Sequence, residues 1–249
     1  MIPAEDGTTL PLLYHLNSEP WMNLEAYAQH SYEVEFKRES GEAVRLPVAD
    51  EGSALMRLLA ARGSCRKYEA RDMALETLST LLGGAYGLTR LNQLDSGIRF
   101  HSRPVPSAGG LYPLELYTLT QRVTGVQDGV HHFEAATNTL RWLQPFPEKE
   151  KLVELFLSQF FLEHANAVVM ISAVFPRTLK KYGARGYRYV LFEAGHVAQT
   201  ICLLAAERKL GSLCVGGFWD ARLNRFMSFD GTTQAVVYCV GVGHPEAEV

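Results

Sequence analysis

The stretch KYGARGYRYVLFEAGHVAQTICLLAAERKLGSLCVGGF, residues 181–218, decides the fold of this chain. Between Gly186 and Lys209 it contains no proline and one interior glycine, Gly195. Its apolar residues recur at helical spacing and cover most of the circumference of the cylinder. This pattern predicts a long helix that is buried on nearly all sides.

Polar side chains lie inside this predicted helix, namely Arg188, Glu193, His196 and Gln199. Burying such groups is costly unless they pair with one another, as in an ordinary core helix, or with a ligand. A strand bounded by glycines, residues 211–215, follows and ends in Gly216-Gly217. Because no Cβ intervenes at glycine, the backbone there can approach a flat ligand closely. Helix and strand together therefore indicate a ligand site. The alternative is a core helix whose polar side chains pair within the protein.

The same stretch resembles the SagB-type dehydrogenases, the flavin-dependent branch of the nitroreductase-like superfamily that oxidises azolines to azoles in modified peptides. The resemblance rests on KYGxRGYRYxxxEAGHxxQ and extends in three blocks over roughly residues 58–245. It implies an α+β nitroreductase-like fold with a mostly antiparallel central sheet packed between helices. It also implies FMN as cofactor, and a homodimer with the active site at the interface.

The first of the other two blocks is a basic turn, residues 62–68, which follows a predicted helix over residues 52–61. Guanidinium forks bind phosphate bidentately and a serine hydroxyl adds one more hydrogen bond, so the turn suits an anion. A solvated basic turn is the alternative from composition alone. The resemblance of RxSxR to the flavin phosphate grip of nitroreductase-like proteins assigns Arg62, Ser64 and Arg66 as phosphate ligands.

The remaining block is RPVPSAGGLYPLELY, residues 103–117, in which a rigid turn leads into a strand. The residues alone predict only an ordered loop before a strand. It resembles the family element PSAGxxxPxExY, which lies against the flavin and commonly comes from the partner subunit. The resemblance thus assigns to the cofactor Pro106, Ser107, Gly109, Gln199, Gly216 and Gly217. Gly110 and Tyr112 stand where ordinary nitroreductases carry asparagine and glutamine, which favours the azoline-oxidising branch.

The catalytic assignment rests on Lys181-Tyr182, which stand where the resembled family has its proton-abstracting pair. A lysine acts as a base only if burial or neighbouring cations lower its pKa, and Lys180, Arg185 and Arg188 are close in sequence. An exposed, charged loop is the alternative. Ala184 and Thr200 depart from residues common in the family, so the resemblance does not identify the substrate.

Composition excludes other functions. With 24 basic and 27 acidic residues the chain has no field that would attract a polyanion, so we expect no nucleic-acid partner. The first residues are acidic and no cationic segment precedes an apolar run, so we expect no signal peptide. No apolar run reaches the roughly eighteen residues that span a bilayer. We therefore expect no membrane partner. The four cysteines show neither a CxxC pair nor the spacing of a zinc finger, which favours a reducing cytoplasm. His131 and His132 would point to opposite faces of a strand, so no metal site is predicted.

The chain reads as an extension, residues 1–50, that packs on one FMN-binding domain, residues 51–249. In the extension we predict a short strand over residues 32–36, and Tyr14-His15 with Trp21 matches the usual start of the resembled family. In the domain we predict helices over residues 72–82, capped by Asp72 and closed by Gly83-Gly84, and 148–159. Residues 91–98 read as a loop. Strands are predicted over residues 114–121, 130–134, 139–143, 165–175 and 235–242.

Three functions follow from these patterns. The first is an FMN-dependent oxidase of a thiazoline, an oxazoline or a similar activated Cα–Cβ unit in a peptide, with hydride passing to flavin N5 and oxygen restoring the flavin. The second is a flavin-binding protein without this activity, either a flavin store or a subunit that scaffolds a modification complex, in which we expect a cyclodehydratase as partner. The third is NAD(P)H-dependent nitro or flavin reduction, for which the sequence has no nicotinamide fingerprint.

Overall fold

The computed structural model describes residues 9–18, 36–47, 52–93, 95–97 and 99–246. Its centre is a six-stranded sheet in the order β5-β4-β3-β6-β8-β7, in which every neighbouring pair is antiparallel. The strands are β3 (Leu114–Thr120), β4 (Gly129–Glu134), β5 (Thr139–Pro145), β6 (Ala167–Val174), β7 (Gly211–Val215) and β8 (Gln234–Gly243). The predicted α+β class with an antiparallel central sheet is confirmed.

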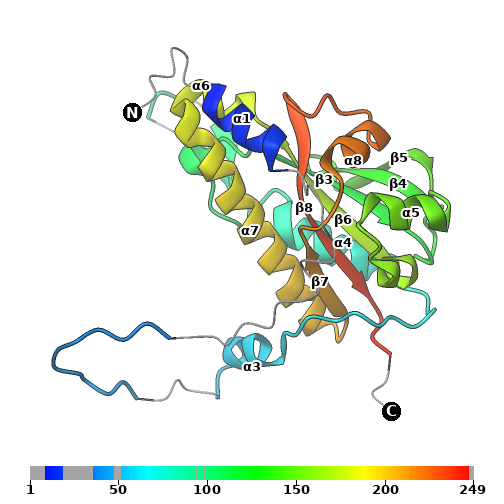
Figure 1. Ribbon diagram of the computed structural model, residues 1–249, viewed down its shortest axis with the longest axis horizontal. Helices are drawn as coiled ribbons and strands as arrows, with labels where there is room; N and C mark the ends of the chain where they lie inside the picture. Colours follow the sequence, from blue (N-terminus) through cyan, green and yellow to red (C-terminus); the bar gives the residue numbers. More distant parts are fainter. Residues whose placement is uncertain (1–8, 19–35, 48–51, 94, 98, 247–249) are drawn as a thin grey trace.

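Helices cover both faces of this sheet (Figure 1). On one face lie α4 (Leu75–Tyr86) and α7 (Ala184–Glu207), and on the other lie α5 (Lys149–Leu155) and α8 (Asp220–Phe226). Successive residues of β6 alternate between the two layers: Val169 and Ile171 pack with α4 and α7, whereas Val168 and Met170 pack with α5 and α8. Because both faces are covered, the central strand is apolar apart from the hydrogen-bonded Ser172, as its sequence predicts.

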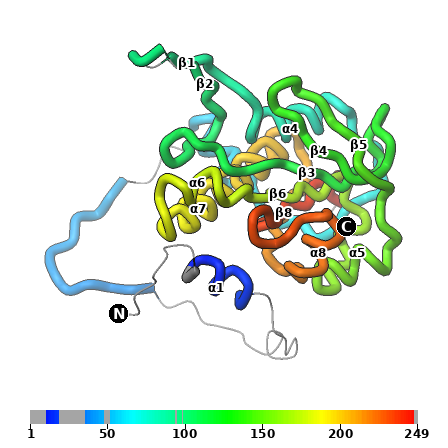
Figure 2. The backbone as a smooth tube through the Cα atoms, turned by 90° about the horizontal axis from the view of Figure 1, so that it is seen from above, coloured from blue at the N-terminus to red at the C-terminus, as the bar shows by residue number. Residues whose placement is uncertain are grey.

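The remaining elements lie around the two ends of α7. Helices α1 (Thr9–Asn17) and α6 (Pro176–Tyr182) flank its N-terminal end, and α3 (Ala54–Ala61) lies near its C-terminal end (Figure 1). Seen from above, α1 lies beside α6 and α7, and residues 36–47 project away from the sheet (Figure 2). Helix α3 has no buried residue, although Leu55 and Leu59 are apolar. This part of the fold therefore presents apolar surface that the described residues leave uncovered.

Helix α7 is not buried on nearly all sides, contrary to the prediction. Its buried residues pack on the sheet and α4, but a stripe along the opposite side is exposed: Arg188, Phe192, Gly195, His196 and Gln199. Phe192 is 55% exposed, whereas Glu193 is 2% exposed. Among the described helices α7 has the length and apolar composition of a membrane span, and its packed face accounts for that composition. The apolar residues of α7 therefore form one packed face, and Phe192 is the large apolar residue of its exposed stripe.

The predicted boundaries of the second helix are wrong for tertiary reasons. Helix α4 begins after Ala74 rather than at Asp72, because Met73 pairs with Val123 in an isolated β-bridge and keeps the preceding backbone extended. The helix also continues through Gly83-Gly84. A Cβ at Gly84 would lie 2.9 Å from Leu204 Cδ1 of α7, so glycine here permits close helix packing rather than ending the helix.

Other local predictions are corrected or confirmed individually. Residues 91–98 are not only loop, because β1 (Leu91–Gln93) pairs with β2 (Arg99–His101). Helix α5 ends at Leu155, and a 3-10 turn, Phe160–His164, follows. His131 and His132 do point to opposite faces: the first is buried beside Thr120, and the second pairs with Glu115. The predicted strand at residues 32–36 lies almost entirely outside the described residues, and Trp21 lies outside them.

Candidate functional site

The predicted phosphate ligands lie around one cavity of about 630 Å³ at the C-terminal end of α7. The segment that carries them runs parallel to the start of β7, since Ser64 bridges Ser212 and the Cys65 amide donates to the Ser212 carbonyl at 2.9 Å. The cavity is lined by four cations, Arg62, Arg66, Lys67 and Lys209. Glu246 is its one acidic lining residue. A donor set of this charge fits a phosphate monoester.

Strand β7 connects this cavity with the predicted ring site. It starts at Gly211, which lines the cavity, and ends at Val215, just before Gly216-Gly217. Five residues of strand cover roughly 17 Å, a length comparable to an extended flavin mononucleotide. Gly216 is exposed, and a Cβ built on it meets only Tyr238, at 3.8 Å. The Gln159 side-chain amide donates to the Gly217 carbonyl at 2.6 Å and fixes the turn.

The loop that contains Pro106, Ser107 and Gly109 is held from beneath by a buried polar network. The Tyr86 hydroxyl donates to Glu193 Oε1 at 2.6 Å, and Glu193 also hydrogen-bonds Ser107. The Tyr112 amide donates to Ser107 Oγ at 2.9 Å. Burial raises the pKa of Glu193, against the opposing effect of these donors. Glu193, one of the polar residues of α7, therefore has its hydrogen-bond partners within the protein, and it positions the loop.

Lys181 and Tyr182 lie directly against this loop. Gly109 has a left-handed backbone, with φ of 64°, and a Cβ built on it would lie 2.6 Å from Tyr182 Oη and 2.8 Å from Lys181 Nζ. The ammonium nitrogen of Lys181 lies 5.3 Å from the centre of the Tyr182 ring. Both residues belong to the last turn of α6, which the sequence analysis did not predict as a helix. Lys181 is exposed and Tyr182 is half-buried among the described residues.

The predicted site residues therefore form two groups at opposite ends of α7. Lys181, Tyr182 and the loop with Gly109 lie near its N-terminus, and the phosphate cavity lies beyond its C-terminus. A helix of 24 residues is about 36 Å long. Gln199 lies between the groups on the exposed side. An extended flavin mononucleotide, comparable to the roughly 17 Å of β7, is about half as long as this helix.

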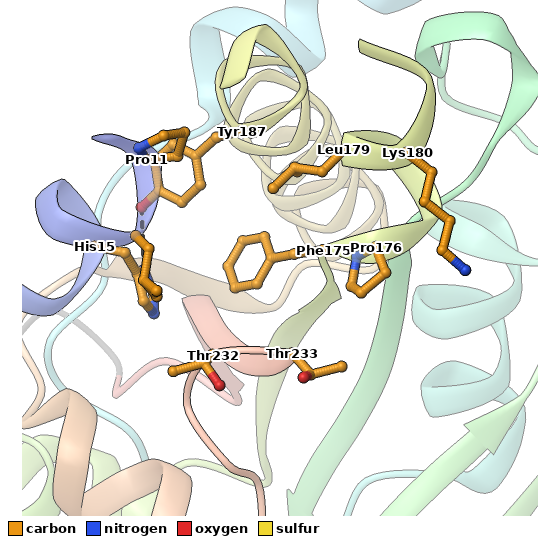
Figure 3. Close-up of a pocket in the computed structure, with 10 residues that line it drawn as sticks. Pro11, His15, Phe175, Pro176, Leu179, Lys180, Tyr187, Thr232 and Thr233 are labelled. Atoms are coloured by element: carbon orange, nitrogen blue, oxygen red, sulfur yellow. Dashed lines mark hydrogen bonds between the residues drawn. The ribbon is translucent and has the colours of Figure 1, made fainter. Parts of the chain in front are cut away.

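A second cavity, of about 330 Å³, lies where α1 meets α6 and the start of α7 (Figure 3). His15 of α1 is 6% exposed, its Nδ1 lies 3.0 Å from Tyr187 Oη, and its ring meets Phe175 edge-on. Burial lowers the pKa of His15, which favours the neutral imidazole. Lys180 lines this cavity whereas Lys181 faces Gly109, so α6 separates the two.

Some residues of the candidate site were not identified from the sequence. Lys209 adds a cation to the phosphate cavity, and its position two residues before the glycine of β7 was the available signal. Gln159 supports Gly217 from 58 residues away, and no local pattern indicates that contact. Among the described residues no group of three metal-ligating side chains is present.

Comparison with known proteins identifies relatives over most of the chain. The family model described as "Nitroreductase family" matches residues 59–244. The predicted nitroreductase MJ1384 of Methanocaldococcus jannaschii is 34% identical over 188 residues, which are 75% of this chain and 91% of that protein. The microcin B17-processing protein McbC of Escherichia coli is 25% identical over 143 residues, 53% of this chain and 51% of McbC.

Solved structures support the fold. The Escherichia coli microcin synthetase McbBCD complex with truncated pro-MccB17 bound contains a chain that superposes with a TM-score of 0.68. The alignment covers 92% of this chain and 83% of that chain at 22% identity. At this level of identity the likeness concerns the fold.

Proposed function

This chain belongs to the nitroreductase family of flavoproteins, and from this premise we propose that it is an FMN-dependent oxidase of azoline rings in a peptide or peptide-like product. FMN would be held by Arg62, Ser64 and Arg66 with Lys209, and its ring would lie against Gly216. When bound, FMN supplies an acceptor for two electrons at N5 and is reoxidised by oxygen.

The observation that carries this proposal is the contact of Lys181 and Tyr182 with Gly109. It joins the predicted base and the predicted flavin-facing loop in one cluster. In the proposed reaction a thiazoline or oxazoline loses a proton from one ring carbon to Lys181 or Tyr182 and a hydride from its neighbour, and it gains one double bond. Lys181 accepts a proton only in its neutral form, so we infer that a second copy or the substrate covers it.

Because the two groups lie at opposite ends of α7, the proposal includes a homodimer in which each flavin draws on both copies. The similarity to McbC, which processes microcin B17, supports a peptide substrate and a modification complex as partner. We place the protein in the cytoplasm, consistent with its free cysteines.

NAD(P)H-dependent nitroreduction or flavin reduction is the second candidate function. It is favoured by the greater identity to the predicted nitroreductase MJ1384. Stopped-flow reduction of the bound flavin separates the two: an azoline peptide should reduce it faster than NADPH if the first proposal holds. Faster reduction by NADPH would reverse the assignment, and reduction by neither would indicate a scaffold subunit.

Mutation of the proposed base tests the mechanism. Lys181→Ala and Tyr182→Phe should retain FMN yet lose azoline turnover by roughly 10²–10⁴-fold, the usual size of a general-base contribution. Lys180→Ala is the matched control, because the neighbouring Lys180 faces the other side of α6, and it should keep activity. Wild-type rates in both variants would reject the base assignment, and loss of FMN would make the pair structural.

A further inference from the structure

Two cysteines that the proposed function does not use face each other beside the phosphate cavity. Cys202 lies on α7 and is buried, and Cys214 lies on β7 and is half-buried. Their sulfur atoms are 3.6 Å apart. A disulfide bond is about 2.05 Å long, so a movement of about 1.5 Å would join them.

The surroundings of this pair are polar, unlike those of a cysteine that only fills space. The Ser212 side chain hydrogen-bonds Cys202, and the Tyr238 side chain hydrogen-bonds Cys214. The guanidinium of Arg62 acts on both sulfurs. A cation with hydroxyl donors favours the thiolate, which is the reactive form of cysteine.

The contact between the two thiols also shifts their pKa values in opposite directions. The hydrogen bond from Cys202 lowers the pKa of Cys214, with Tyr238 and Arg62 acting in the same direction against burial. The hydrogen bond with Cys214, together with burial, raises the pKa of Cys202. Cys214 is also the more accessible residue of the two, so it is the one that a soluble oxidant reaches first.

The other two cysteines of the chain lack this arrangement. Cys65 donates to the Lys67 carbonyl at 3.1 Å and contacts no second sulfur. Cys239 is fully buried, and burial raises the pKa of its thiol well above the usual value. Both serve as internal controls.

We propose that Cys202 and Cys214 form a redox-active dithiol that hydrogen peroxide converts to a disulfide between α7 and β7. The Cys214 thiolate attacks one peroxide oxygen and becomes a sulfenic acid, and the other oxygen leaves as hydroxide and takes up a proton. The Cys202 sulfur then displaces water from the sulfenic acid. In sum, two thiols and one peroxide give one disulfide and two waters. This inference does not depend on the proposed azoline chemistry, because the oxidant is added directly.

Peptide mapping of the full-length chain tests the proposal. The protein is reduced, freed of reductant, treated with one equivalent of hydrogen peroxide, denatured, alkylated and digested with trypsin. Cleavage at Arg208 and Lys209 separates the two cysteines, so a disulfide appears as two joined peptides. We expect alkylatable thiols to fall from four to two and to return with dithiothreitol. Four alkylated thiols, a link through another cysteine, or sulfinic acid at Cys214 without a link would overturn the proposal.

Single substitutions test the order of the two steps. In Cys202→Ser, Cys214 should stop at the sulfenic acid and be trapped by dimedone. In Cys214→Ser, Cys202 should remain alkylatable at the peroxide dose that links the wild type. Cys65→Ser and Cys239→Ala should form the link as the wild type does. Equal loss of the Cys202 thiol in Cys214→Ser and in wild type would contradict the assigned order.

Discussion

At Gly216, packing within the protein does not require the absence of a side chain. A Cβ there would meet only Tyr238, at 3.8 Å, which is ordinary contact. At Gly217, by contrast, a Cβ would lie 3.0 Å from Gln159 Nε2, so a side chain there would displace the glutamine that hydrogen-bonds the Gly217 carbonyl. The protein itself leaves room for a side chain at Gly216, and the proposed function assigns this room to the flavin ring.

Substitution of Gly216 separates cofactor binding from folding. We expect Gly216→Val to unfold at a temperature close to that of the wild-type apoprotein but to bind FMN at least tenfold more weakly, because the side chain would occupy the proposed ring site. FMN titration by fluorescence and thermal unfolding of the apoprotein check the two parts. A variant that binds FMN as the wild type does would place the ring elsewhere.

At the scale of elements, the sequence predicts best those that the sheet core determines. Strand β6 was predicted from its continuous apolar run, which reflects burial on both faces, and helix α7 from its helical periodicity, which reflects packing on the sheet. Helix α6 was missed, since Lys180, Lys181 and Tyr182 suggested a charged loop rather than the last turn of a helix that begins at Pro176. The start of α4 was wrong because a long-range bridge at Met73 replaced the expected cap.

The candidate site was predictable only in part, for a related reason. Local motifs identified the cationic turn at Arg62, because its residues lie together in sequence. They did not identify Lys209 or Gln159, which reach the site through tertiary contacts. Nor did they show that Gly109 meets Lys181 across 72 residues, which the family resemblance had not specified either.

Docking of α1 should depend on pH through His15. Its pKa is lowered by burial, so below about pH 6.5 the unfolded chain binds a proton that the folded chain resists. Stability therefore falls as pH decreases from about 6.5 through the lowered pKa. His131 has a pKa lowered by burial and contributes in the same window, so the measurement must be a difference between variants.

Two substitutions isolate the contribution of His15. His15→Phe should lose about 0.5–1.5 kcal/mol at pH 8 with the hydrogen bond to Tyr187, and its deficit should shrink toward pH 5 because phenylalanine does not titrate. Tyr187→Phe removes the same hydrogen bond but keeps the buried imidazole, so its deficit should stay constant. Urea unfolding across this pH range provides the free energies. If the loss of unfolding free energy is constant with pH in both variants, His15 is not the titrating group.

At the scale of the whole molecule, the proposed homodimer accounts for both the exposed stripe of α7 and the separation of the two groups of site residues. The stripe is centred on Gly195, the midpoint of the helix, where a Cβ would meet nothing. A twofold axis near that point would bring two α7 helices together in opposite directions. The Lys181 end of one copy would then lie beside the phosphate cavity of the other, and Phe192 would be covered.

Mixed dimers test this arrangement directly. Arg62→Ala with Arg66→Ala should lose FMN, since charge-assisted bonds contribute about 1.5–3 kcal/mol each, and Lys181→Ala with Tyr182→Phe should keep FMN but lose azoline turnover. Co-expression with two different tags and tandem purification yields dimers with one chain of each kind. If each site draws on both copies, one site per mixed dimer is intact and turnover should return to about half that of a doubly tagged wild type. If each site lies within one chain, the mixed dimer stays as inactive as its parents, because every site then carries a lesion.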